Sequence, residues 1–241
     1  MKTLAVEGWE TRQRILVILA HPDDPEFFCG ATIARWVDAG HSVRYCLLTC
    51  GDKGSSDPLM DPRELARLRE GEQRAAAAVL GVESVRFLNY PDGELIPTLE
   101  ARREVVRVVR QEKPDILVTC DPTNYFPDDT RINHPDHRAA GQIVVDAFFP
   151  GVGNPMYFPA LIQDGLPPHT VKELWLSGTI QPNTTLDVTP FWPVKLAALH
   201  EHRSQIGEVA AFDERMLSRR APDSTPEAPR FEEKLRRFKF A

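Results

Sequence analysis

The stretch that decides the fold is RILVILAHPDDPEFFCG, residues 14–30. It opens with an apolar run, residues 14–20, of the length and composition of a buried strand. The polar motif HPDD, residues 21–24, follows directly. A segment of helical composition, residues 31–39, comes next and stops at Gly40. A strand, a polar turn and a helix in this order form the repeating unit of an α/β sheet.

The same alternation continues through the first half of the chain. We expect further strands over 43–49, 84–90 and 116–120, and helices over 62–80, 98–113 and near 138–148. This order predicts an α/β fold with a Rossmann-like, mostly parallel sheet and helices on both faces.

The second half is less regular. Residues 150–169 are typical of a loop, and strands are expected over 171–178 and 184–188. We expect a helix over 193–202 and another in the charged tail, 231–241. The simplest interpretation is one domain over residues 1–241 with a loop-rich C-terminal portion.

Composition narrows the classes of protein. The 241 residues carry a formal net charge of −6, which gives no support to a nucleic-acid partner. No apolar stretch reaches the roughly 18 residues that span a membrane, and the N-terminal segment lacks the apolar region of a secretory signal. We therefore expect a soluble, cytoplasmic protein. The four cysteines form no C-x-x-C pair and are expected to be buried free thiols: Cys29, Cys46, Cys50 and Cys120.

A second His-Pro-Asp motif, HPDH at residues 134–137, lies on the loop after the fourth expected strand. In a doubly wound sheet of order 3-2-1-4-5, strands one and four are neighbours whose connections leave in opposite directions. Ligands bind in the crevice that this reversal opens at the carboxyl ends of the strands. This topology would bring the two motifs together.

Together the motifs supply the donors of one metal site. Two imidazoles and one carboxylate, with a fourth position left open, are typical of a catalytic zinc site, whereas structural sites more often use cysteines. Of two adjacent aspartates, one can bind the metal while the other takes a proton from the attacking water. The simpler alternative is that the aspartates only cap helices and form turns: Asp23, Asp24, Asp121 and Asp136. Repetition of the motif after two strands of one sheet favours the metal site.

The quoted residues resemble a known family. AHPDD…GDKG (residues 20–54) and NHPDHRAAG (residues 133–141) are similar to the LmbE-like, or PIG-L-type, zinc-dependent N-deacetylases, which include N-acetylglucosaminyl deacetylases. The resemblance runs over residues 14–205. It implies a hydrolase that removes an N-acetyl or other N-acyl group from a small amino-sugar derivative, such as an N-acetylglucosamine conjugate. It also implies zinc, although iron, cobalt and manganese accept similar donors, and a homo-oligomer such as a trimer or hexamer.

The resemblance also assigns roles to residues. It implies a metal held by His21, Asp24 and His137. Asp23 corresponds to the general base. His134 lies beside the reacting carbonyl, where it stabilises the oxyanion or protonates the leaving amine, and Asp136 sets the charge state of His134.

Further positions are matched less closely. Arg69 resembles a substrate-contacting residue, and Asp92, in the loop YPDGEL, resembles a sugar-contacting aspartate. Glu26 is interpreted as a turn residue or a support for the metal ligands, and Cys29 as a shield for the metal or an inert thiol. His202 is interpreted as a surface or packing histidine.

The sequence leaves other functions as alternatives to a sugar deacetylase. The same site would serve an amidase acting on a thiol conjugate or another non-sugar amide. A non-catalytic metal-binding relative is disfavoured because the set of motif residues is complete. A nucleotide-binding Rossmann protein is disfavoured because no G-x-G-x-x-G follows the first expected strand.

Overall fold

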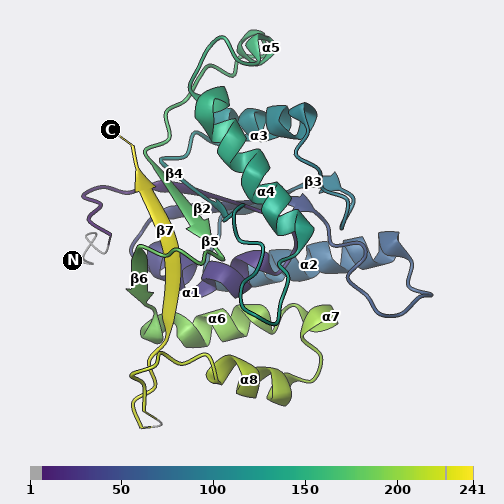
Figure 1. Ribbon diagram of the computed structural model, residues 1–241, viewed down its shortest axis with the longest axis vertical. Coiled ribbons are helices and arrows are strands. Elements are labelled where there is room, and N and C mark those ends of the chain that lie inside the picture. The colour runs from purple at the N-terminus through teal and green to yellow at the C-terminus, as the bar shows by residue number, and fades with distance from the viewer. Residues whose placement is uncertain (1–6, 226, 241) are drawn as a thin grey trace.

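A seven-stranded sheet forms the centre of the molecule (Figure 1). The computed structural model describes residues 7–225 and 227–240. The strands are β1 (Arg14–Leu19), β2 (Ser42–Thr49), β3 (Ser84–Tyr90), β4 (Ile116–Cys120), β5 (Glu173–Ser177), β6 (Thr184–Asp187) and β7 (Glu232–Lys239). Their order is β3-β2-β1-β4-β5-β7-β6. The first five run parallel, and β7 is antiparallel to both of its neighbours. The predicted mostly parallel sheet and its order 3-2-1-4-5 are confirmed.

Helices cover both faces of this sheet, as predicted (Figure 1). The longer helices are α1 (Asp24–Asp38), α2 (Pro62–Leu80), α3 (Leu99–Glu112), α4 (Pro135–Asp146), α6 (Trp192–Leu199) and α8 (Val209–Leu217). Shorter pieces are η1 (Ala147–Val152), α5 (Pro159–Gln163), η2 (Thr189–Phe191) and α7 (Arg203–Ile206). Residues of α1, α2, α6 and α8 share one hydrophobic core, and those of α3 and α4 share the other.

Strand β1 separates the two cores. Its odd-numbered residues, among them Val17, face the α1 and α2 side, while Leu16 and Ile18 face the α3 and α4 side. A parallel strand covered on both faces needs apolar side chains in both directions, which explains the continuous apolar run of β1.

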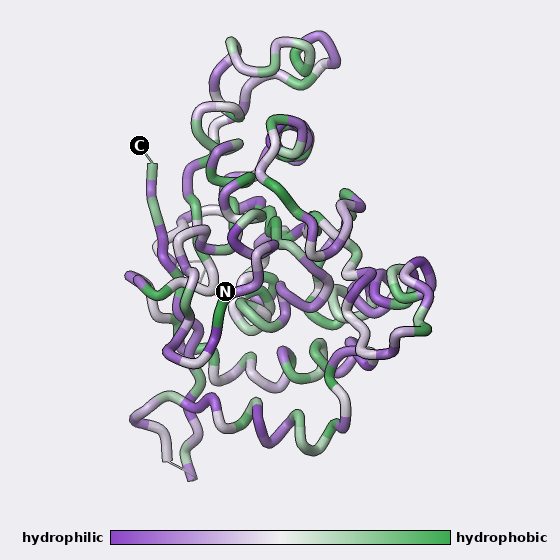
Figure 2. Tube along the Cα trace, turned by 45° about the vertical axis from the view of Figure 1, so that its right-hand side comes forward, coloured by the Kyte–Doolittle hydropathy of each residue, from purple (hydrophilic) through white to green (hydrophobic). Residues whose placement is uncertain are grey.

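The outer helix α8, in contrast to β1, is amphipathic. Its residues Phe212 and Met216 are buried, and hydropathy alternates along its length (Figure 2).

The charged tail differs from the prediction. The sequence predicts a helix over residues 231–241, but the structure, which describes the tail up to residue 240, places β7 (Glu232–Lys239) between β5 and β6. The buried residues Phe231, Glu233 and Leu235 alternate with more exposed ones, which is the period of a strand. The many charges of the tail obscured this alternation in the sequence.

Two helices also begin earlier than predicted. Helix α1 begins at Asp24 and α4 at Pro135, so both motifs run directly into helices. A proline in the first turn of each suits a helix start, because that position needs no backbone N–H donor.

The four cysteines are free and buried, as expected. Within the described part of the chain, no helix has the length and apolar character to cross a membrane.

Candidate active site

The two His-Pro-Asp motifs meet at the carboxyl ends of β1 and β4, which are paired neighbours. The first motif leads from β1 into α1, and the second opens α4. The ring centroid of His21 lies 4.6 Å from that of His134 and 5.2 Å from that of His137. The predicted encounter of the motifs at this sheet edge is therefore what the structure shows.

The carboxylate of Asp24 lies between two of these histidines. Its Oδ1 is 3.0 Å from His137 Nε2, and its Oδ2 is 3.4 Å from His21 Nδ1. Oδ2 also accepts a hydrogen bond from the His21 backbone N–H at 2.8 Å. Burial alone would raise the pKa of Asp24, but His137 and His21 hold it well below its usual range. Asp24 is therefore a charged, fixed oxygen donor beside two imidazoles.

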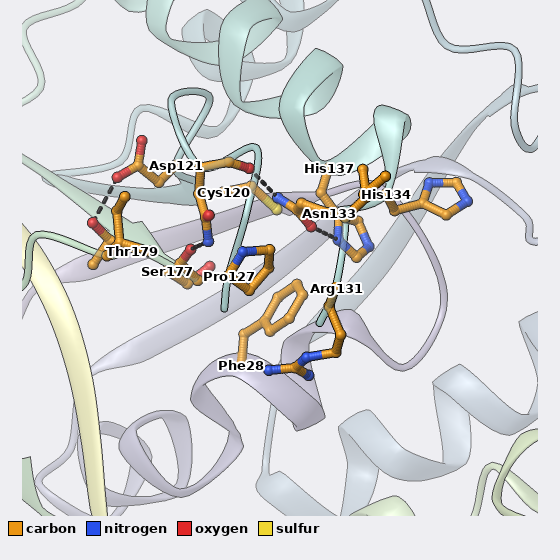
Figure 3. Close-up of a pocket in the computed structure, with 14 residues that line it drawn as sticks. Phe28, Cys120, Asp121, Pro127, Arg131, Asn133, His134, His137, Ser177 and Thr179 are labelled. Atoms are coloured by element: carbon orange, nitrogen blue, oxygen red, sulfur yellow. Dashed lines mark hydrogen bonds between the residues drawn. The ribbon is translucent and has the colours of Figure 1, made fainter. Parts of the chain in front are cut away.

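Asn133 orients His137, and sequence reasoning missed it although it directly precedes the second motif. Its side-chain Nδ2 donates to the Asn124 carbonyl at 2.8 Å, which leaves its Oδ1 to accept from His137 Nδ1 at 3.1 Å (Figure 3). Because Asn133 engages Nδ1, Nε2 is the ring nitrogen that faces Asp24 and that would bind a metal placed between them. Metal-binding histidines are commonly held in this way.

These groups fit a divalent transition metal. Ring nitrogens of His21, His134 and His137 lie within 4.8 Å of one another, and so do donor atoms of His21, Asp92 and Asp136. Burial alone would lower the pKa of His21, but the surrounding carboxylates raise it to about 12. A place that so favours positive charge also suits a metal cation, and imidazole with carboxylate is a donor set that zinc accepts. The ligand set His21, Asp24 and His137 remains a prediction.

Asp23 stands beside this donor group with an unusual backbone. Its φ of 83° lies in the left-handed region, which residues other than glycine adopt rarely. Burial and the neighbouring charge of Asp24 raise its pKa to about 7, against a lowering effect of Arg69. A carboxylate with a pKa near neutrality can both accept and return a proton, which is what a general base needs.

His134 presents one defined ring nitrogen to the site. Its Nδ1 accepts from the Asp136 backbone N–H at 3.2 Å, so the neutral ring carries its proton on Nε2. Burial and the nearby His21 and His137 lower the pKa of His134. His134 is thus a neutral hydrogen-bond donor at neutral pH.

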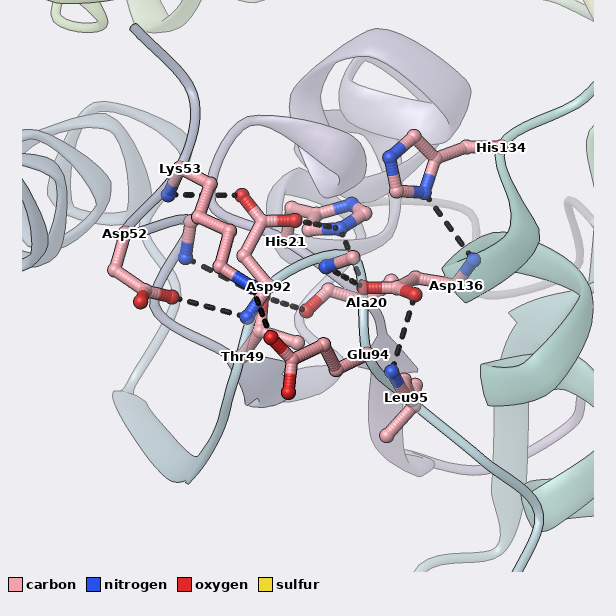
Figure 4. A network of polar contacts seen from close by, with 12 residues as sticks. Ala20, His21, Thr49, Asp52, Lys53, Asp92, Glu94, Leu95, His134 and Asp136 are labelled. Carbon is pink, nitrogen blue, oxygen red and sulfur yellow. Dashed lines mark hydrogen bonds and ion pairs between the residues drawn. The ribbon is translucent and has the colours of Figure 1, made fainter. Parts of the chain in front are cut away.

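The Asp136 carboxylate points elsewhere than expected. It accepts from the backbone N–H groups of Gly93 at 2.7 Å and Leu95 at 3.2 Å, and its Oδ2 lies 3.2 Å from His21 Nε2 (Figure 4). Its contact with His134 is through the backbone. Asp136 therefore anchors the loop after β3 to His21, and its influence on the charge of His134 acts through space.

The two expected substrate contacts, Arg69 and Asp92, line the same cavity of about 310 Å³ as His21 and Asp23. Asp92 Oδ1 is 3.0 Å from His21 Nε2. Arg69 is buried, and its guanidinium donates to the carbonyls of Pro22 and Gly51 and to Asp23 Oδ2. Their roles in substrate binding remain predictions, but Arg69 has a second role as a support for Asp23.

Three further residues singled out in the sequence lie behind the cavity. Glu26 and His202 are fully buried and contact each other, with 3.1 Å between Glu26 Oε2 and His202 Nε2. His202 is thus a packing histidine with a polar partner. Cys29 is fully buried, and burial raises the pKa of its thiol well above the usual value. This thiol is uncharged and inert at neutral pH.

Comparison with known proteins agrees with this geometry. Residues 16–148 match the model of the PIG-L family, GlcNAc-PI de-N-acetylase. The chain belongs to this family. The resemblance predicted from the two motifs is confirmed, and membership supports a deacetylase activity.

Individual relatives extend the similarity over most of the chain. The chain is 36% identical over 203 residues to diacetylchitobiose deacetylase of Thermococcus kodakarensis, covering 84% of this chain and 73% of the relative. It is 30% identical over 250 residues to 1D-myo-inositol 2-acetamido-2-deoxy-alpha-D-glucopyranoside deacetylase of Streptomyces avermitilis, covering 80% and 83%. The solved structure of N,N'-diacetylchitobiose deacetylase from Pyrococcus horikoshii is similar with a TM-score of 0.84 and 29% identity, covering 94% and 84%.

Proposed function

We propose that this protein is a metal-dependent hydrolase that removes the N-acetyl group from an N-acetylglucosamine-type sugar within a conjugate. The main support for this proposal is the arrangement of the motif residues. The Asp24 carboxylate lies between His21 and His137, with the left-handed Asp23 next to it, at the edge of an open cavity. The names of the relatives support the same reaction on amino sugars.

The proposed ligands of the metal are His21, Asp24 and His137. Zinc is the proposed ion, and when bound it would polarise the amide carbonyl and make water more acidic. Asp23 takes the proton of the attacking water. His134, with Nε2–H toward the site, donates a hydrogen bond to the developing oxyanion. The proton held by Asp23 is then available for the leaving amine.

The shape of the site supports a conjugate as substrate. A second cavity of about 380 Å³ adjoins the first, and Phe28, His134 and His137 line both (Figure 3). Its wall includes polar groups such as Asp121 and Ser177. Small-molecule sites commonly measure about 300–1,000 Å³, so the two cavities together offer room for more than one sugar ring. We place the reacting sugar near Asp23 and the remainder of the conjugate toward the second cavity.

The test is release of primary amine from a panel of amides. The panel contains N-acetylglucosamine, N,N'-diacetylchitobiose, an N-acetylglucosaminyl inositol and the amide of a thiol conjugate. Each is incubated with chelator-treated protein and with protein reloaded with zinc, iron, cobalt or manganese. We expect release from sugar conjugates that requires metal. Release from the thiol conjugate alone would favour the amidase alternative, and no release from metal-loaded protein would contradict the proposed function.

The assignment of Asp23 has its own prediction. Asp23→Asn removes the proton acceptor but leaves the three proposed ligands in place, so we expect unchanged metal content and a loss of turnover of roughly 10²–10⁴-fold. Metal content is measured by elemental analysis, and turnover by amine release. Parental turnover in this variant would remove Asp23 from the mechanism.

A further inference from the structure

A chain of buried polar side chains connects His202 to the backbone of Asp23. Gln73, fully buried on α2, donates from Nε2 to both Glu26 oxygens at 3.1 and 3.0 Å. Glu26 Oε2 in turn lies 3.1 Å from His202 Nε2. At the other end, Gln73 Oε1 accepts from the Asp23 backbone N–H at 2.8 Å. Glu26, Gln73 and His202 are absent from the walls of both cavities at the site. They therefore act on the reaction only indirectly, and the hydrogen bond between Gln73 and the Asp23 N–H is a direct link to the site.

Helix α2 holds the peptide group between Pro22 and Asp23 at both of its polar atoms. Arg69 Nη2 donates to the Pro22 carbonyl at 2.9 Å, and Gln73 accepts from the N–H of the same peptide. Arg69 and Gln73 are four residues apart and so lie on one face of α2, one turn from each other. Because a planar trans peptide directs its C=O and N–H to opposite sides, the two contacts together fix the orientation of its plane.

This orientation matters because Asp23 has a left-handed backbone. Its φ of 83° and ψ of −27° place it in a region that persists for a non-glycine residue only where the surroundings hold it. Without the contact from Gln73, Arg69 alone holds this peptide, and its plane can turn toward a more common conformation. The direction of the Asp23 carboxylate would then change with it.

Glu26 and His202 determine which end of the Gln73 amide faces Asp23. An amide can turn over and exchange its oxygen for its NH₂ group. A carboxylate accepts hydrogen bonds only from the NH₂ end, so Glu26 directs the Gln73 oxygen toward the Asp23 N–H. His202 holds Glu26 from a distant part of the chain. These contacts give a role to both residues beyond packing.

We propose that Gln73, oriented by Glu26 and His202, is a positioning residue that aims the carboxylate of Asp23. The inference rests on the proposed function, in which Asp23 is the general base. It goes further in assigning the support of that base to a set of residues outside the substrate cavity.

The first test is Gln73→Met, which keeps the length of the side chain and removes its hydrogen bonds to Glu26 and to the Asp23 N–H. With N,N'-diacetylchitobiose as substrate, we expect kcat to fall roughly 10–100-fold, as misplacement of a reacting group does. KM should stay within about twofold of the parent, since Gln73 does not line the cavity, and metal content should be unchanged. The control is Ala76→Gly. Ala76 is buried one turn further along α2, and glycine at this position weakens the helix. It should keep the parental kcat.

An exchange of donor and acceptor provides a second test. Gln73→Glu alone places a carboxylate against Glu26 and removes the donor, so we expect a loss of kcat. In the double variant Gln73→Glu with Glu26→Gln, the amide donor and the carboxylate acceptor have changed places, and the net charge equals that of the parent. A carboxylate oxygen at position 73 still faces the Asp23 N–H. The double variant should recover at least about tenfold in kcat over Gln73→Glu. This pair also serves if Gln73→Met does not fold, and failure to recover would contradict the positioning role.

A double-mutant cycle separates positioning from general structural support. If Gln73 acts through the Asp23 carboxylate, adding Gln73→Met to Asp23→Asn should reduce kcat by less than about twofold further. Additive losses, or parental kcat in Gln73→Met, would overturn the inference while leaving the proposed function intact. Parental kcat in Asp23→Asn would instead overturn the base assignment and this inference with it.

Discussion

Asp23 and Asp24 are adjacent in the chain, but their surroundings move their pKa values apart. Burial and the charge of Asp24 raise the pKa of Asp23 to about 7, while His137 and His21 keep Asp24 ionised despite its burial. Paired carboxyl groups with divergent pKa values commonly divide the work of a site. At this scale, burial and the neighbouring charges decide whether a carboxylate serves as a proton acceptor or as a ligand.

Asn133 permits a test at the residue scale. Asn133→Ala removes the acceptor that holds the proton on His137 Nδ1, so His137 loses its fixed orientation. We expect the affinity for zinc to fall roughly 10–100-fold, measured by competition with a chromophoric chelator. Asn154→Ala, a substitution in the segment after α4, is the control and should leave the affinity unchanged. Parental affinity in Asn133→Ala would contradict the orienting role.

Helix α2 is the element that supports the site from outside the two motifs. Its Asp61 N-cap accepts from the Arg63 N–H, and Gly81 ends it in the left-handed conformation, which agrees with the predicted span of residues 62–80. Arg69 extends from this helix to the loop after β2. There a Cβ at Gly51 would lie 2.2 Å from the Arg69 guanidinium. The loop therefore needs a glycine at this point to let the helix reach Pro22 and Asp23.

Gly51→Ala tests this fit between element and loop. Gly51 has a φ of +65°, so alanine there costs about 1–2 kcal/mol in backbone strain and also displaces Arg69. We expect at least a tenfold loss of kcat in amine release. Gly165→Ala is a matched control, because Gly165 has a φ of +78° and open space around it. It should lose similar stability and keep its activity; equal losses of activity in both variants would contradict the role of Arg69.

At the scale of the whole molecule, β7 joins the C-terminal part of the chain to the parallel sheet. Arg237 on β7 donates two hydrogen bonds to Glu173 on β5, at 2.9 and 2.7 Å. Trp9 and Trp175 donate to the same carboxylate. Burial alone would raise the pKa of Glu173, but these donors lower it below its usual 4.5. Burial raises the pKa of Glu7, against lowering effects of Arg35 and, to a smaller extent, Arg237.

This ion pair predicts how stability depends on pH. A carboxylate with a depressed pKa stabilises the folded state at neutral pH, and the stabilisation is lost as the pH falls through the folded-state pKa. We expect Arg237→Gln to cost roughly 1.5–3 kcal/mol at pH 7, because the largely buried Glu173 carboxylate loses its cationic partner and keeps only the two Trp donors. The difference from the parent should shrink below about pH 4.5. Urea unfolding at several pH values checks this.

The exposed pair of Arg12 and Glu83 provides the control for that experiment. Arg12→Gln should change stability by less than about 1 kcal/mol at any of these pH values. A difference between parent and Arg237→Gln that does not change with pH would contradict the assignment to Glu173.

The chain by itself determined the parts of the structure that depend on local pattern. Apolar runs separated by helical segments predict a parallel sheet covered on both faces, because buried parallel strands need apolar residues on both faces. The two motifs predict one donor set, because the switch between strands one and four brings their carboxyl ends together. The true start of α1 at Asp24 was also readable from Pro25, once a proline is taken as a helix start.

Only the tertiary structure decided the contacts between distant segments. Glu26 and His202 are 176 positions apart, and the direction of the Asp136 carboxylate depends on a loop 41–43 positions earlier. The tail became a strand because β5 and β6 offer it unpaired edges on both sides. Such contacts follow from which side chains packing brings within hydrogen-bond distance, and no periodicity in the chain encodes them. The donors of the site could therefore be predicted from the sequence, but the residues that orient them could not.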